Sequence, residues 1–168
     1  MALFDVPMVP RDGAITLSDA TATPIVATIA YEEGDFSFDE ISADNWDTEV
    51  FFDRGVPYAI RNVVKRLFGF QFTAHATDFT DATEKTLLDA VRKKGAFASG
   101  VSMKGATYDV WLLKTVFTAE QSNYGASADS VLTLNYCWLK AGFAEGVPGK
   151  FSVKGIAIPF ADTDIAMT

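Results

Sequence analysis

The chain has one histidine, His75, and one cysteine, Cys137, and a thiol beside an imidazole is the pair that a cysteine nucleophile requires. Such a pair needs an exposed, acidified thiol and usually a carboxylate that orients the imidazole. Cys137 instead stands in the segment LNYCWL, which is typical of a buried strand, and Asp78 near His75 belongs to no recognisable motif. The sequence therefore predicts that both residues are structural and that no catalysis depends on them.

Metal and phosphate sites have equally little support. One histidine and one cysteine cannot complete a structural zinc site, and no segment matches a calcium loop. The Gly-Lys of GVPGKFS lacks the glycine spacing of a phosphate-binding loop. Paired carboxylates in DNWDTE (44–49) and around residues 32–35 suit a glycosidase or a divalent ion, although acidic turns are far commoner than active sites. We expect no cofactor, no metal and no enzyme activity.

Charge is distributed unevenly along the chain. The net charge is −8, which argues against nucleic-acid binding by the whole surface. Residues 1–60 hold 12 acidic and 2 basic side chains, whereas residues 61–168 hold 10 acidic and 12 basic ones. This division indicates either two surfaces of unlike charge or a merely uneven solvated surface.

Alternating apolar residues predict a chain made mostly of strands. In FGFQFTAHAT (68–77) every second residue is apolar, as in a strand with one buried face. The segment 56–68 fits a bent strand or a short helix almost equally, and we favour a strand. Comparable patterns, with turn residues between them, occur at 14–17, 25–31, 32–38, 107–118, 129–139 and 149–158. With 68–77 these are seven strands, and 56–68 is the ambiguous segment.

One helix is expected over about 81–94. Asp81 and Glu84 have the spacing of a capping box, and the run Lys93-Lys94-Gly95 is typical of a helix end. Within it, Asp89 and Lys93 have the i, i+4 spacing of an exposed ion pair. An apolar face would be formed by Leu87, Leu88 and Val91.

Together these elements predict a mainly β (α+β) domain, an antiparallel β-sandwich or barrel with one flanking helix. We expect an extended arm at 1–13, a single domain at 14–160 that carries a long acidic loop at 39–55, and a tail at 161–168. No apolar run is long enough to span a bilayer, and the N-terminus lacks the features of a secretory signal. We therefore expect a soluble protein made in the cytoplasm.

Read in order, the segments IVATIAYEEGDFSF, FGFQFTAHATDFTDATEKTLLDAV and GFAEGVPGKFSVKGIAI give a further indication. Over roughly residues 12–160 the chain resembles the tail tube (major tail) proteins of long-tailed bacteriophages. The resemblance implies hexameric rings that stack into a tube, other tail proteins at the tube ends, and DNA that passes without specific binding. It implies a virion component assembled in the host cytoplasm. The tubes of contractile tails and of type VI secretion share this fold, so the resemblance does not choose among those systems.

Two groups of residues are candidates for assembly on this interpretation. The contacts between subunits or rings are expected to involve Trp46, Val50, Phe51, Phe52, Arg61, Lys65 and Arg66. The channel wall is expected to be acidic, with Glu32, Glu33, Asp35, Asp39 and Glu40 facing the lumen.

Several alternatives remain at this stage. The rings of the 39–55 loop could complete the subunit's own core, and the acids could lie between rings, opposite Arg61, Lys65, Arg66 or the Lys93–Lys94 helix end. In other classes, a carbohydrate-binding module could use Trp46, Trp111 or Trp138, although core packing is favoured for the last two, and a small hydrolase could use the acidic cluster.

Overall fold

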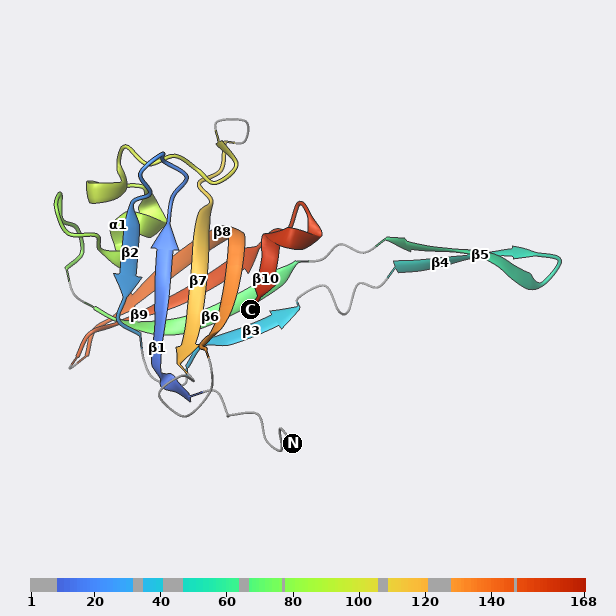
Figure 1. Cartoon of the computed structure of the whole chain (residues 1–168), viewed down its shortest axis with the longest axis horizontal. Coiled ribbons are helices and arrows are strands. Elements are labelled where there is room, and N and C mark those ends of the chain that lie inside the picture. The colour runs from blue at the N-terminus through green and yellow to red at the C-terminus, as the bar shows by residue number, and fades with distance from the viewer. Residues whose placement is uncertain are drawn as a thin grey trace.

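The computed structural model describes residues 9–31, 35–40, 47–63, 67–76, 78–105, 109–120, 128–146 and 148–168. The described residues form strands, one short α-helix and short 3-10 turns (Figure 1). The strands are β1 (Val9–Ser18), β2 (Val26–Ile29), β3 (Ser37–Glu40), β4 (Asp47–Asp53), β5 (Val56–Val63), β6 (Phe68–His75), β7 (Leu113–Glu120), β8 (Ser130–Ala144), β9 (Lys150–Ala157) and β10 (Ile165–Met167). The helix α1 is Leu87–Arg92, and the turns are η2 (Gly95–Phe97) and η5 (Asp162–Asp164).

One antiparallel sheet contains all strands except β4 and β5. Its order is β2-β1-β7-β8-β9-β6-β3, and β10 adds to β8. The β2 end of this order meets β6, because Tyr31 after β2 bridges Ala74 on β6, and the His75 amide donates to the Ala30 carbonyl at 2.9 Å. Strand β3 pairs with β6 and with no other described strand, so it keeps one open edge. The sheet therefore closes on itself as a small barrel, and the expectation of a β-rich fold with one helix is confirmed.

Strand β8 organises the barrel because it is long enough to pair with three neighbours. Its 15 residues pair with β7 and β10 in the first half and with β9 in the second half. The pairing with β7 shifts register between Leu113 and Thr115, which lets the strand bend around the barrel. Figure 1 shows β8 running across the barrel beside β7, β9 and β10.

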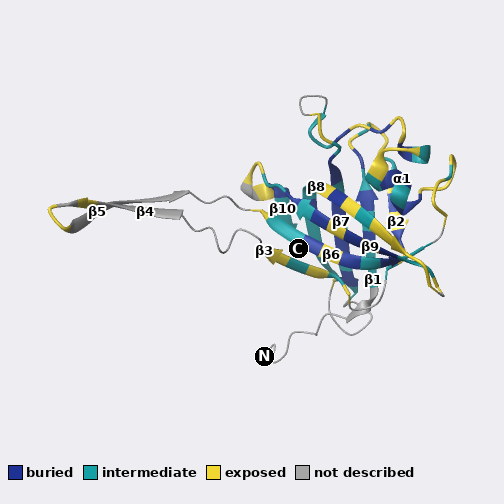
Figure 2. Ribbon diagram, turned by 180° about the vertical axis from the view of Figure 1, so that it is seen from behind, coloured by how far each residue is buried: buried dark blue, intermediate teal, exposed yellow. Residues whose placement is uncertain are grey.

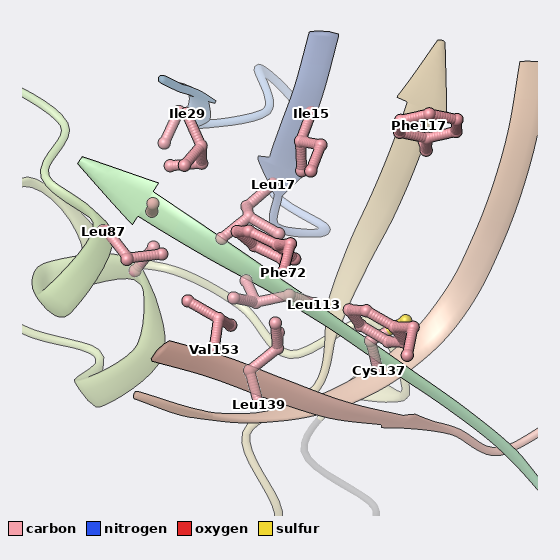
Figure 3. Packing of buried hydrophobic residues seen from close by; sticks show 14 of the residues in the cluster. Ile15, Leu17, Ile29, Phe72, Leu87, Leu113, Phe117, Cys137, Leu139 and Val153 are labelled. Carbon is pink, nitrogen blue, oxygen red and sulfur yellow. The ribbon is translucent and has the colours of Figure 1, made fainter. Parts of the chain in front are cut away.

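The core fills the inside of the barrel. Along β7 and β9, buried residues alternate with more exposed ones, as expected of strands with one face in a core. Leu17, Phe72, Leu113 and Val153 are among the fully buried side chains that meet there (Figure 3), and burying each such side chain contributes about 1.5–3 kcal/mol. In Figure 2 most of the buried residues lie on the barrel strands and some on α1 and the segments beside it, whereas the tips of the loops are mostly exposed.

The helix is shorter than expected, because α1 begins at Leu87 rather than near residue 81. Its N-cap is Thr86, whose hydroxyl accepts from the Asp89 amide. Asp81 caps only a local turn, accepting from the amides of Thr83 and Glu84. The hydrogen bond from the Glu84 amide to the Asp81 side chain thus forms, but it closes an isolated turn, and the helix begins only at Leu87.

Asp89 explains this difference. Its side chain is 2% exposed, and its carboxylate accepts hydrogen bonds from the Thr80 hydroxyl and the Asp81 amide, both at 2.9 Å. These bonds hold residues 80–81 beside the helix instead of in line with it. The expected surface pair between Asp89 and Lys93 is therefore wrong, since Lys93 is the C-cap in the left-handed region and Asp89 is buried.

Other boundaries also differ from expectation. Strand β4 lies inside the stretch expected to be a loop, and 56–68, ambiguous in sequence, contains strand β5. Strand β1 begins within the expected arm, at Val9. The tail at 161–168 contributes β10 to the barrel, because the Asp164 carboxylate accepts from the amides of Phe160 and Ala161 and turns the chain back toward β8.

Candidate assembly surface

His75 and Cys137 do not form a catalytic pair. His75 pairs with Lys150 at one end of β9, and Cys137 pairs with Ala157 at the other end, seven residues and about 23 Å of strand away. The Cys137 side chain is fully buried (Figure 3), and this burial raises the pKa of its thiol to about 12. A thiol with so high a pKa is protonated at neutral pH and cannot act as a nucleophile there.

The described residues contain no cluster of metal-ligating side chains. Among them, no group of three or more His, Cys, Asp or Glu side chains could hold a metal ion. The three buried aspartates, Asp19, Asp89 and Asp164, each accept hydrogen bonds from backbone amides. Asp19, for example, accepts from Ile25 at 2.7 Å and from Val101 at 3.0 Å, which joins two loops. These carboxylates stabilise loops.

The candidate contact residues are associated with the hairpin of β4 and β5. These two strands pair with each other and with no strand of the barrel, and Figure 1 shows the hairpin extending away from it. Phe52, next to the turn at Arg54 and Gly55, is 62% exposed. Val50 lies opposite Ile60 in the hairpin. Phe51 and Arg61 also lie in its strands, whereas Trp46, Lys65 and Arg66 lie outside the described residues.

The candidate lumen residues are only partly described. Asp35 and Asp39 are exposed, and Glu40 ends strand β3. Glu32 and Glu33 lie outside the described residues. Strand β3 is the last strand in the order of the sheet, so Asp39 and Glu40 lie at the margin of the sheet.

An apolar groove opens at the end of the barrel near the chain's C-terminus. It has a volume of about 530 Å³, and the stacked rings of Phe36 and Phe117, 4.1 Å apart, form part of it. Met167 on β10, which is 69% exposed, lines it too. Sequence reasoning did not find this groove, because it depends on β10 and β3 meeting beside β7.

A second surface that sequence reasoning missed is the lysine face, which we define as the outward side chains Lys140, Lys150, Lys154 and Trp138 of β8 and β9. The exposed positions of β9 alternate with the buried Phe151 and Val153. On β8, the Lys140 ammonium lies 4.8 Å from the centre of the Trp138 ring. In sequence Lys140 stands in a different segment from Lys150 and Lys154, and only the pairing of β8 with β9 brings it beside them.

The two described tryptophans, Trp111 and Trp138, lie in different environments. Trp111 is half-buried, its indole N–H donates to the Ala90 carbonyl at 2.6 Å, and the Lys93 ammonium lies over its ring. Trp138 is 44% exposed, so the expectation that it packs in the core is wrong. Trp46 lies outside the described residues.

Comparisons with known proteins address the fold. No family model matches the chain, and no curated protein matches its sequence. A solved structure does match in three dimensions: the sheath/tube terminator of PVC, an extracellular contractile injection system, in its extended state. The TM-score is 0.56 at 9% sequence identity, and the match covers 98% of each chain. The chain therefore shares its fold with that protein over nearly its whole length.

Among the described residues, no helix is long and apolar enough to cross a membrane.

Proposed function

We propose that this chain is a structural subunit of a tail-like particle, which forms hexameric rings that stack into a tube conducting DNA. The observation that carries the proposal is the whole-length likeness in fold to a sheath/tube terminator. A likeness that covers 98% of both chains includes the hairpin as well as the barrel, so it supports an assembling subunit more than a shared barrel alone would.

The barrel offers strand edges that suit ring formation. Strand β3 ends the order of the sheet, and β10 pairs with β8 on one side. Open edges invite pairing with another chain, and proteins that remain monomeric usually blunt them. A ring joined through such edges also requires two unlike surfaces on each subunit, and the uneven charge along the chain supports the presence of such surfaces.

The hairpin is the proposed contact between subunits or rings. Phe52 exposes apolar surface near the turn, and such surface usually marks a partner site. We assign to the same contact Trp46, Val50, Phe51, Arg61, Lys65 and Arg66, which lie in the hairpin or in the segments that join it to the barrel.

The channel of the tube is proposed to be acidic along the β3 margin. Acidic side chains repel phosphates, so DNA slides past without binding. The residues assigned to this wall are Glu32, Glu33, Asp35, Asp39 and Glu40. Other tail proteins would cap the tube ends, and the protein would reside in the assembled particle.

A second candidate is a terminator, which would form one ring at the end of a tube. The specific observation in its favour is that the matched structure is itself a sheath/tube terminator. Electron microscopy of the purified protein separates the two. A tube subunit gives stacks of many rings with a distribution of lengths, whereas a terminator gives single rings. Dispersed monomers would contradict both.

A further inference from the structure

Two lysines of the lysine face repel each other in the isolated subunit. Lys140 on β8 lies directly opposite Lys154 on β9, and both side chains are exposed. Like charges at directly opposite positions destabilise an antiparallel pair. Among the described residues, no carboxylate forms an ion pair with either ammonium, and Lys140 lies over the Trp138 ring instead. A position that costs stability in the monomer indicates a role with an anionic partner.

The surroundings of this pair form a shallow site for an extended chain. Lys150 precedes Lys154 by four residues on the same side of β9, about 13 Å away, and lies opposite His75. A groove of about 490 Å³ extends from Lys154 to Asp39. These two side chains are the charged ones among the residues that line it. Between the two lysines of β9 the floor consists of small side chains, namely Ser152, Thr73 and Gly142.

The same chain supplies an acidic segment of suitable form. Residues 32–53 contain nine acidic and no basic side chains, and strand β4 lies within them. In the hairpin, Glu49 has Arg61 as its opposite residue, whereas Asp47 and Asp53 lie opposite valines. Asp47 and Asp53 are about 20 Å apart along the strand. The separation of Lys150 and Lys154 is shorter, about 13 Å. Lysine side chains are long and flexible, so their ammonium groups can reach carboxylates that lie farther apart than the lysine backbones do.

We propose that the lysine face receives the acidic strand β4 of a second copy of this chain. The inference rests on the proposed function, in which the chain assembles with copies of itself. A subunit's own hairpin pairs with no strand of its barrel and extends away from it (Figure 1), so a second copy is the available donor. The net charge of −8 disfavours nucleic acid as the occupant. Because two different surfaces meet, the contact repeats head to tail and generates a ring or a stack.

The test uses two charge-reversed versions of the full chain. Lys140→Glu/Lys154→Glu reverses the face, and Asp47→Lys/Asp53→Lys reverses the strand while keeping Glu49 opposite Arg61. Association with immobilised copies of the same variant is expected to weaken roughly tenfold or more for each, because like charges then meet. Mixing the two variants is expected to restore association, since each reversed face then meets a reversed strand. Wild-type association is expected to weaken as salt rises.

Controls separate docking from folding. Lys85→Glu/Arg92→Glu makes the same change in net charge at exposed positions in or beside α1, and it is expected to leave association unchanged. Lys140→Glu alone places opposite charges across β8 and β9, so it is expected to raise the midpoint of thermal unfolding while weakening association. A stabilised variant that associates less well cannot be explained by misfolding.

Several outcomes overturn the inference: unchanged association of both reversed variants, failure of their mixture to associate, or a lysine-dependent affinity for a short DNA duplex with self-association unchanged. The proposed function fails separately. If wild-type copies pair through this contact without forming rings, the proposed function is wrong and the docking stands. If rings form equally well from both reversed variants, the docking is wrong and the proposed function stands.

Discussion

At the scale of single residues, buried polar groups determine the local shape of this chain. Asp89 accepts bonds from the Thr80 hydroxyl and the Asp81 amide. Gly95, with φ +49°, packs so closely against Asp89 that a side chain at Gly95 would collide with this carboxylate. The Asp81 amide is half-buried, so it retains part of its cost of desolvation when it loses this acceptor. The turn before α1 thus depends on one carboxylate.

Asp89→Ala is expected to lower the free energy of unfolding by roughly 2–4 kcal/mol, because the Asp81 amide and the Thr80 hydroxyl lose a charged acceptor. Asp89→Asn keeps an acceptor oxygen and should cost less. Urea denaturation measures both, with the exposed Asp78→Ala as the matched control. A loss below about 0.5 kcal/mol for Asp89→Ala would show that these bonds do not hold the turn.

Cys137 gives the fold a dependence on alkaline pH. Burial raises the thiol pKa to about 12, whereas an unfolded cysteine ionises near 8.5–9. Between these values the unfolded chain loses a proton that the folded chain keeps, so stability falls by up to about 1.4 kcal/mol per pH unit. We expect the thermal midpoint to fall more steeply from pH 9 to 11 in the wild type than in Cys137→Ala. Parallel curves would contradict this.

At the scale of elements, some of the fold could be predicted and some could not. The strand at β6 was predictable because Phe70, Phe72 and Ala74 alternate with polar residues and are buried. The start of α1 was not, because a tertiary hydrogen bond of Asp89 outweighs the local capping pattern. Strand β4 was missed because acidic, turn-favouring residues precede it. The lysine face required the pairing of β8 with β9, which no local pattern specifies.

The hairpin is expected to be dispensable for folding and required for assembly. Replacing residues 47–63 by a short Gly-Ser linker removes two strands that pair with no strand of the barrel, so the thermal midpoint of the barrel should hardly change. Light scattering should then show monomers at concentrations where the wild type assembles. Phe52→Ser should weaken assembly, and Val26→Ser, another exposed apolar position, should not. Normal assembly of the deletion variant would rule out this role.

At the scale of the whole molecule, the acidic residues between positions 32 and 40 are the proposed channel wall. Glu32→Lys/Glu33→Lys should give tubes that bind a short DNA duplex, because lysines in the channel hold phosphates and release counterions. Wild-type tubes should bind none. Glu84→Lys/Glu145→Lys makes the same change of charge at exposed positions elsewhere. Fluorescence anisotropy measures the binding, and equal DNA affinity of the two variants would show that Glu32 and Glu33 do not line the channel.

We propose that this chain assembles with itself into rings of six. Native mass spectrometry of the purified wild-type chain tests it most directly, since the subunit mass is 18.2 kDa. As concentration rises, species of six subunits and multiples of six are expected to replace the monomer. A monomer at every concentration, or a dominant species whose subunit number is not a multiple of six, would contradict it.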